Sequence, residues 1–122
     1  MAKILVIDDE ATVRKLLTAL FEKEGYEVKN GYDGNNGLSI AREFEPDLII
    51  TDLLMPEKEG LETIKEIKQM NADIKIIAIS GGGIIQPELY LKLAEQGGAD
   101  MSFTKPVDID LLLTAVKQLL EE

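Results

Sequence analysis

The sequence predicts an α/β domain, (βα)5, in which five parallel strands alternate with five helices. Four apolar runs, at residues 4–7, 48–51, 74–79 and 101–104, are continuous rather than alternating. Such runs are typical of strands buried on both faces, as in a parallel sheet covered by helices. Between them, apolar residues recur at the spacing of amphipathic helices. A chain of 122 residues has room for one such domain but not two.

Two helices are expected in the first half of the chain. The first spans residues 10–24 and ends at Gly25. Its apolar stripe consists of Val13, Leu16, Leu17, Leu20 and Phe21. A short strand around residues 26–30 follows, and Asp33 is placed to cap a second helix over residues 34–43. The side chains of that helix expected to face inward are Leu38, Ala41 and Phe44. Residues 45–47 end the helix before the next strand.

Three helices are expected in the second half. Gly60 begins the third, which ends near Asn71. Its residues at helical spacing are Leu61, Ile64, Ile67 and Lys68. Pro87 begins the fourth, which runs to about residue 96 and is closed by two glycines. Asp108 caps the fifth, whose shared face consists of Leu112, Ala115, Val116 and Leu119. No linker or repeat interrupts the pattern, so residues 1–122 are expected to form a single domain.

Composition excludes several classes of site. The chain has no cysteine and no histidine, which excludes disulfides, thiolate metal sites, histidine-bound zinc and imidazole bases. A net charge of −10 argues against direct binding to nucleic acid, which needs clustered lysine and arginine. No run approaches the roughly 20 apolar residues of a membrane span. A cytoplasmic location, with no membrane partner, is therefore expected.

Four of the predicted strands end in residues able to carry out chemistry. Asp8 and Asp9 follow the first apolar run, and Asp52, Ser80 and Lys105 follow the other three. Parallel strands share one carboxyl edge, and open α/β sheets bind their ligands there. Each residue also has a local explanation: Asp8 and Asp9 as the N-cap and a first-turn acid of the first helix, the others as ordinary turn residues.

Taken together, the residues at this edge suit phosphate chemistry. Three carboxylates can provide the oxygen ligands that Mg²⁺ prefers. A carboxylate such as Asp52 can attack phosphorus and form an aspartyl phosphate. The Lys105 ammonium would offset the repulsion of the acids and bind a phosphoryl oxygen.

These residues resemble the receiver domain of two-component response regulators. The matching segments are residues 7–10, 51–56, 80–81 and 98–106, which span the chain in the family's order. The resemblance implies a flavodoxin-like three-layer fold with strand order 2-1-3-4-5. It also implies that Asp52 accepts the phosphoryl group. The implied Mg²⁺ ligands are Asp9 and Asp52 directly, Asp8 through water, and the Leu54 carbonyl. The implied phosphoryl-binding groups are Ser80, Lys105 and the backbone of Leu53 and Gly81.

The family's function would then apply. The chain would take a phosphoryl group from a sensor histidine kinase or phosphotransfer protein and change its surface for a downstream protein target, rather than release a product as an enzyme does. One alternative is the N-terminal receiver of a longer transcriptional regulator, although the ending without a linker favours a stand-alone chain. Others are a Mg²⁺-dependent phosphohydrolase, disfavoured by Leu54 where a second acid is usual, and an unphosphorylated scaffold, disfavoured because every acid and the lysine are present.

Two departures from the family concern signal output. Ser102 stands where the family usually has an aromatic residue, and its neighbour Phe103 should face the core because strand neighbours point to opposite faces. The loop after Ser80 is glycine-rich. The switch candidates are therefore Ser80, Gly81, Gly82, Gly83 and Ser102. This loop leads to a helix rich in apolar residues, which with the fifth helix could form a surface for a partner or a phosphorylation-dependent homodimer. These residues are Leu89, Tyr90, Leu91 and Leu93.

Overall fold

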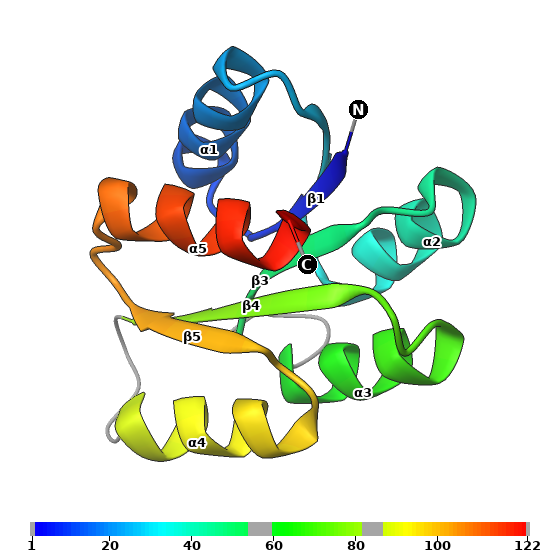
Figure 1. Ribbon diagram of the computed structural model, residues 1–122. Helices are drawn as coiled ribbons and strands as arrows, with labels where there is room; N and C mark the ends of the chain where they lie inside the picture. Colours follow the sequence, from blue (N-terminus) through cyan, green and yellow to red (C-terminus); the bar gives the residue numbers. More distant parts are fainter. Residues whose placement is uncertain (1, 54–59, 82–86, 122) are drawn as a thin grey trace.

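The computed structural model describes residues 2–53, 60–81 and 87–121, which form a three-layer α/β/α sandwich (Figure 1). The strands of this described part are β1 (Lys3–Ile7), β2 (Glu27–Gly31), β3 (Leu48–Asp52), β4 (Lys75–Ser80) and β5 (Met101–Thr104). Its helices are α1 (Ala11–Lys23), α2 (Gly34–Phe44), α3 (Gly60–Met70), α4 (Pro87–Gly97) and α5 (Ile109–Glu121). None of these helices combines the length and the apolar character that crossing a bilayer requires.

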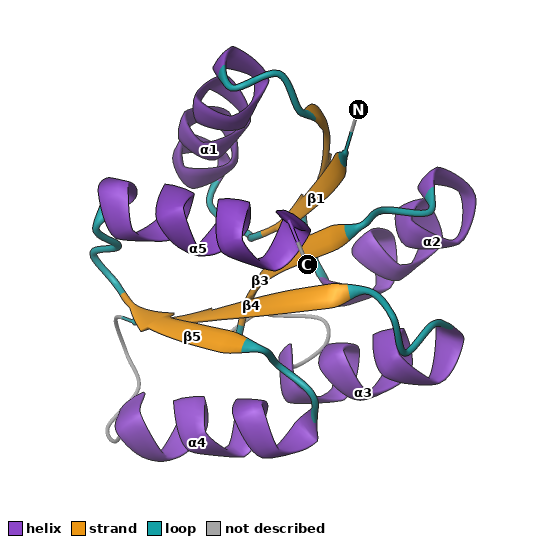
Figure 2. Ribbon diagram, in the orientation of Figure 1, coloured by secondary structure: helices purple, strands orange, loops and turns teal. Residues whose placement is uncertain are grey.

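The sheet is parallel throughout, with strand order β2-β1-β3-β4-β5 (Figure 2). The flavodoxin-like topology expected from the family resemblance is therefore confirmed. Because the crossover helices return the chain to the same end of the sheet each time, all five strands point the same way. The carboxyl ends of β1, β3, β4 and β5 lie side by side as a result.

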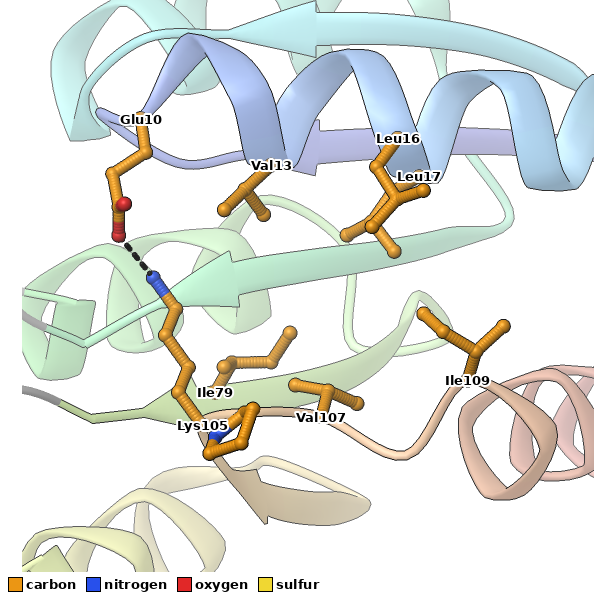
Figure 3. A pocket seen from close by; sticks show the side chains of 9 residues that line it. Glu10, Val13, Leu16, Leu17, Ile79, Lys105, Val107 and Ile109 are labelled. Atoms are coloured by element: carbon orange, nitrogen blue, oxygen red, sulfur yellow. Dashed lines mark hydrogen bonds and ion pairs between the residues drawn. The ribbon is translucent and has the colours of Figure 1, made fainter.

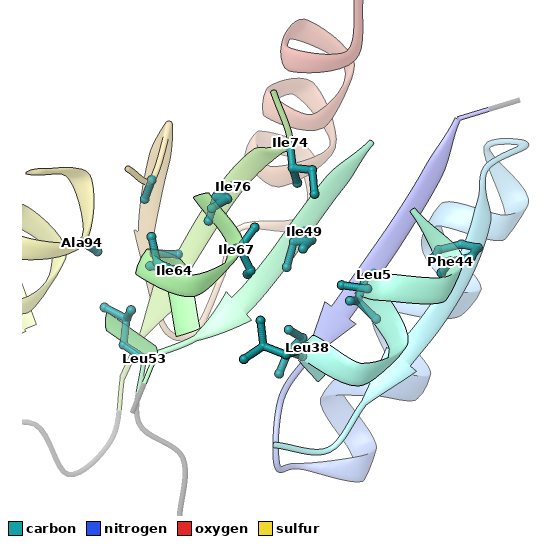
Figure 4. Close-up of a cluster of buried hydrophobic side chains, with 14 residues drawn as sticks. Leu5, Leu38, Phe44, Ile49, Leu53, Ile64, Ile67, Ile74, Ile76 and Ala94 are labelled. Carbon is teal, nitrogen blue, oxygen red and sulfur yellow. The ribbon is translucent and has the colours of Figure 1, made fainter. Parts of the chain in front are cut away.

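Each face of the sheet has its own core. Leu5, Ile49 and Ile76 point toward α2, α3 and α4 and belong to one buried cluster (Figure 4). Their strand neighbours Ile4 and Ile77 point the other way, into a cluster covered by α1 and α5. Strand residues alternate between faces, so strands buried on both sides must be apolar at nearly every position. This explains the continuous apolar runs.

The expected helix boundaries are confirmed to within about a residue at most ends. Gly25 follows α1 with φ 95°, a left-handed conformation that glycine adopts without strain. The Asp33 side chain accepts a hydrogen bond from the Asn36 amide at 2.8 Å, and Asp108 accepts one from the Leu111 amide at 3.1 Å, as N-caps do.

The apolar stripe of α1 is only partly buried. Leu17 and Phe21 are fully enclosed, whereas the Leu16 residue is 57% exposed. The stripe is wider than the surface that the sheet and α5 offer, so the side chain at its edge stays in solvent. Leu16 instead borders a groove between α1 and the segment that follows β5.

Gly60 fixes the start of α3 against the end of β3. Its amide donates to the Leu53 carbonyl at 3.0 Å, and a Cβ at Gly60 would lie 2.5 Å from both the Asp52 carbonyl oxygen and the Leu53 Cα. These are backbone atoms, which cannot move aside as a flexible side chain can. Only a residue without Cβ fits here.

We therefore expect Gly60→Ala to lower the free energy of unfolding by about 2 kcal/mol, because overpacking forces the backbone to shift. Urea unfolding followed by circular dichroism measures the change. Gly97→Ala is the matched control, since a Cβ there meets nothing within 4 Å. Equal stability of the two variants would show that α3 is not held this closely.

Candidate functional site

The residues at the carboxyl edge of the sheet meet in one acidic cluster. Asp8 and Asp9 follow β1 and Asp52 ends β3, and carboxylate oxygens of these three residues and of Glu10 all lie within 4.8 Å of one another. Asp8 and Asp52 are buried, while Asp9 and Glu10 are exposed. The predicted meeting of three carboxylates is thus observed. Glu10 is a fourth that the sequence interpretation missed, although its place directly after two aspartates was a signal.

Asp8 is held by its own loop. Its Oδ1 accepts a hydrogen bond from the Glu10 amide at 2.8 Å, and its backbone carbonyl accepts one from Arg14 Nη1 at 2.6 Å. The N-cap of α1 is Glu10 and its first turn contains no acid, so the local explanation of Asp8 and Asp9 as N-cap and first-turn acid is wrong.

Burial raises the pKa of the Asp8 carboxyl above its ordinary value, and the charge of Asp52 adds to this effect. The hydrogen bond from the Glu10 amide and the ammonium of Lys105 oppose the rise. Asp8 is 2% exposed and lies beside other acids, so its ionised form is destabilised unless a cation binds next to it.

Lys105 is the cation that joins the cluster. Its Nζ lies 3.1 Å from Asp8 Oδ2, 2.9 Å from Glu10 Oε1 and 3.0 Å from Asp52 Oδ2. Burial would lower the pKa of the Lys105 ammonium, but the hydrogen bonds that it donates to Glu10 and Asp52, with the charges of Asp52 and Asp8, outweigh burial and raise the pKa. Lys105 is therefore charged at neutral pH.

Ser80 lies at the end of β4, beside Lys105. The Ser80 carbonyl accepts a hydrogen bond from the Lys105 amide at 2.7 Å, which holds the two residues side by side. Its Oγ is buried and has no hydrogen-bond partner among the described residues. A buried hydroxyl without a partner loses the hydrogen bonds that water would give it, and this loss is recovered when a ligand supplies one.

Two backbone details complete the site. A Cβ at Gly81 would collide with the Lys105 side chain, so the absence of a side chain lets Lys105 lie across this position. The Leu53 amide donates to the Ile79 carbonyl at 2.9 Å. The expected contacts of the Leu53 and Gly81 backbone with a phosphoryl group stay predictions. Leu54, Gly82 and Gly83 lie outside the described residues.

The donor set fits a small divalent cation. The cluster offers only carboxylate oxygens, and Asp9 is exposed enough to bind a cation that keeps several of its waters. Mg²⁺ prefers such oxygen ligands and is usually held by one or two carboxylates plus water. The buried Ser80 hydroxyl has no hydrogen-bond partner among the described residues and is a donor that an oxygen-rich group could use.

We expect Asp8→Asn to stabilise the metal-free protein. The folded-state pKa of Asp8 is raised, so in the absence of metal its contribution to stability is greatest at low pH and is lost as pH rises through that value. Asparagine never ionises and avoids this loss. In EDTA at neutral pH we expect a rise in Tm of roughly 4 °C, measured by thermal unfolding.

The matched control is Glu43→Gln, which removes an exposed acid near the end of α2 and should leave Tm almost unchanged. A lower Tm for Asp8→Asn than for this control, at neutral pH and without metal, would contradict the strain assigned to the Asp8 anion.

Comparison with known proteins gives a consistent result. Residues 4–117 match the family described as the response regulator receiver domain. The chain is 34% identical over 118 residues to sporulation initiation phosphotransferase F of Bacillus subtilis, covering 97% of this chain and 93% of that protein. It is 33% identical to the DNA-binding dual master transcriptional regulator RpaA of Synechocystis, of which it spans 49%. A crystal structure of a receiver domain protein from Clostridium thermocellum superposes with a TM-score of 0.90 at 33% identity, over 99% of this chain and 95% of that one.

Proposed function

Since this chain belongs to the response regulator receiver domain family and is a signalling phosphoacceptor rather than a true enzyme, we propose that Asp52 is the residue that accepts the phosphoryl group. The contact that carries this proposal is the 3.0 Å ion pair between Lys105 Nζ and Asp52 Oδ2. It sets a buried carboxylate beside the cation that a phosphoryl group needs, at the end of β3, next to the strand that ends in Ser80. Residues 1–122 form a single receiver domain in this proposal.

The chemical step is a transfer between two nucleophiles. An Asp52 carboxylate oxygen attacks the phosphorus of a phosphohistidine, the new O–P bond forms, and the N–P bond breaks as the histidine leaves. Lys105 turns from Asp52 to an oxygen of the incoming group, and the Ser80 hydroxyl donates to another. In this proposal the Gly81 amide donates a further hydrogen bond, and the Leu53 amide adds another by giving up its hydrogen bond to the Ile79 carbonyl. Together these donors stabilise the charge on the phosphoryl oxygens as it redistributes.

Mg²⁺ is the proposed cofactor of this step. Asp9 and Asp52 would bind it directly, Asp8 would bind it through water, and the Leu54 carbonyl, outside the described residues, would be a further ligand. When bound, the cation neutralises negative charge on the carboxylates and the phosphoryl group so that two anions can meet. The acidic cluster is typical of the magnesium pocket of receiver domains.

A groove beside the site supports docking of the phosphodonor, a histidine kinase or phosphotransfer protein. It has a volume of about 490 Å³ and runs between α1 and the segment that follows β5 (Figure 3). Leu16 and Val13 line one side, Val107 and Ile109 line the other, and Lys105 stands at its end. A helix that carried the phosphohistidine could bury apolar side chains here while the imidazole reaches Asp52.

The docking proposal predicts that Leu16→Ser slows phosphotransfer from an autophosphorylated kinase about tenfold, the loss of one well-buried interface side chain. Phosphorylation by acetyl phosphate, which needs no docking, should be unchanged. Leu111→Ser, which removes an equally exposed leucine from α5, is the control. Equal slowing with both donors would place the effect of Leu16 on the fold rather than on docking.

The surface that binds the downstream partner is proposed to lie on α4 and α5. Leu89 and Leu93 of α4 and Leu111 of α5 are between 43% and 59% exposed, which supports a surface for a downstream protein or a homodimer. Phe103 packs with the α1–α5 cluster, as expected, and Ser102 lies on the opposite face, where its hydroxyl donates to Glu95 of α4 at 2.6 Å. Signalling takes place in the cytoplasm in this proposal.

A direct test is incubation with Mg²⁺ and acetyl phosphate, followed by intact-protein mass spectrometry. We expect the mass of one phosphoryl group to be added, and none to be added in EDTA. Steady release of phosphate from phosphomonoesters, without a phosphorylated chain, would instead favour the phosphohydrolase alternative.

A further inference from the structure

Glu10 has an unusual position for its residue type. It is the N-cap of α1, where serine, threonine, aspartate and asparagine are preferred, and its side chain makes no capping hydrogen bond in the described structure. Its Oε1 instead accepts a hydrogen bond from Lys105 Nζ at 2.9 Å, from a residue 95 positions later in the chain (Figure 3). The side chain of Glu10 therefore serves the site rather than the helix.

Lys105 divides its ammonium among three carboxylates. An ammonium has three protons to donate, and among the described residues the carboxylate oxygens that pair with it belong to Asp8, Glu10 and Asp52. Two of these residues, Asp8 and Asp52, are the acids expected to face Mg²⁺. Glu10 is the partner left over, and its 56% exposed side chain is free to follow the ammonium if it shifts.

We propose that Glu10 is a positioning residue that retains Lys105 beside Asp52 while the oxygens of Asp8 and Asp52 are turned to Mg²⁺. The inference rests on the proposed phosphoacceptor function. It adds a reason why Mg²⁺ and the Lys105 ammonium can occupy one small cluster together. Without Glu10, the partners left to Lys105 would be the oxygens that the metal requires. The ammonium would then compete with Mg²⁺ directly, and the affinity for Mg²⁺ would fall.

Removal of Glu10 also removes one negative charge, which by itself weakens the binding of any cation. A double-mutant cycle separates the two effects, because it isolates the part of the change that depends on Lys105. If Glu10 acts through Lys105, its removal has little effect on Mg²⁺ affinity once the ammonium is absent. If Glu10 acts as a general charge or as a metal ligand, its effect is the same with and without Lys105.

The experiment measures the Mg²⁺ dissociation constant by calorimetry for the unsubstituted chain, Glu10→Gln, Lys105→Met and the double variant. We expect Glu10→Gln to weaken Mg²⁺ binding about fivefold in the presence of Lys105 and less than about twofold in the Lys105→Met background. Glu10→Asp, which keeps the charge on a side chain one methylene shorter, should resemble Glu10→Gln. Thermal unfolding of each variant verifies that it is folded at the temperature of the titration.

Equal weakening of Mg²⁺ binding by Glu10→Gln with and without Lys105 would overturn the proposal. Full Mg²⁺ affinity in Glu10→Asp together with reduced affinity in Glu10→Gln would also overturn it, because Glu10 would then act through its charge alone. Phosphorylation of the unsubstituted chain by acetyl phosphate is scored separately. A chain that shows the coupling but accepts no phosphoryl group refutes the proposed function and leaves the role of Glu10 intact. A chain that is phosphorylated but shows no coupling refutes only the role of Glu10.

Discussion

Asp52→Asn is expected to abolish phosphoryl incorporation while the protein remains folded. Attack on phosphorus requires an anionic oxygen, and an amide oxygen is a far weaker nucleophile. The side chain of asparagine has the same shape and still accepts a hydrogen bond from Lys105. Loss of one carboxylate also relieves repulsion in a cluster whose acids lie within 4.8 Å of one another. Intact mass after incubation with Mg²⁺ and acetyl phosphate measures the outcome.

Asp73→Asn is the matched control, since it removes an exposed aspartate from the turn before β4. It should be phosphorylated to the same extent as the unsubstituted chain. Phosphoryl incorporation in Asp52→Asn at a rate comparable with this control would assign the acceptor to another residue.

Lys105→Met is expected to have a large effect on stability as well as on phosphorylation. Without the ammonium, the carboxylates of Asp8 and Asp52, which are 2% and 5% exposed, lose the ion pairs that they make with Lys105 at 3.1 and 3.0 Å. Removal of one partner from a fully buried ion pair costs about 3–5 kcal/mol. Lys105 is 19% exposed and Glu10 is open to water, so we expect a loss of about 2 kcal/mol in EDTA.

Saturating Mg²⁺ should recover most of this loss, because a bound dication replaces the missing positive charge and stabilises the folded state by mass action. Urea unfolding in EDTA and in Mg²⁺ gives both values. Lys117→Met is the control, because Lys117 pairs with Glu24 on the surface between α5 and α1. If Lys105→Met were as stable in EDTA as this control, the ammonium would not be the counter-ion of the cluster.

The strand pattern of the fold was predictable because burial on both faces leaves a simple sequence signal. Residues 48–51 and 74–79 are apolar at nearly every position because they fit between two layers of helices, and they form β3 and β4 with shifts of one residue at their ends. The alternation of faces likewise predicted that Phe103 packs inward. The strand order came from the family resemblance, since periodicity alone leaves several topologies open.

The site was predictable to the extent that it depends on where strands end. Asp8, Asp52, Ser80 and Lys105 meet because parallel strands share an edge, which is a property of topology. The contact of Glu10 with Lys105 depends on the direction of one side chain across 95 residues of sequence, and no local pattern encodes it. The exposure of Leu16 was not predictable either, because tertiary packing decides how much of the apolar stripe of α1 is covered.

The central claim, phosphorylation of Asp52, is tested most directly by reduction of the phosphorylated chain with borohydride. Borohydride reduces an aspartyl phosphate to homoserine, so the acceptor is marked permanently before the labile bond hydrolyses. Peptide mass spectrometry should then find homoserine at position 52, only after incubation with Mg²⁺ and acetyl phosphate. Homoserine at another aspartate, or a phosphorylated chain that yields none at position 52, would contradict the assignment.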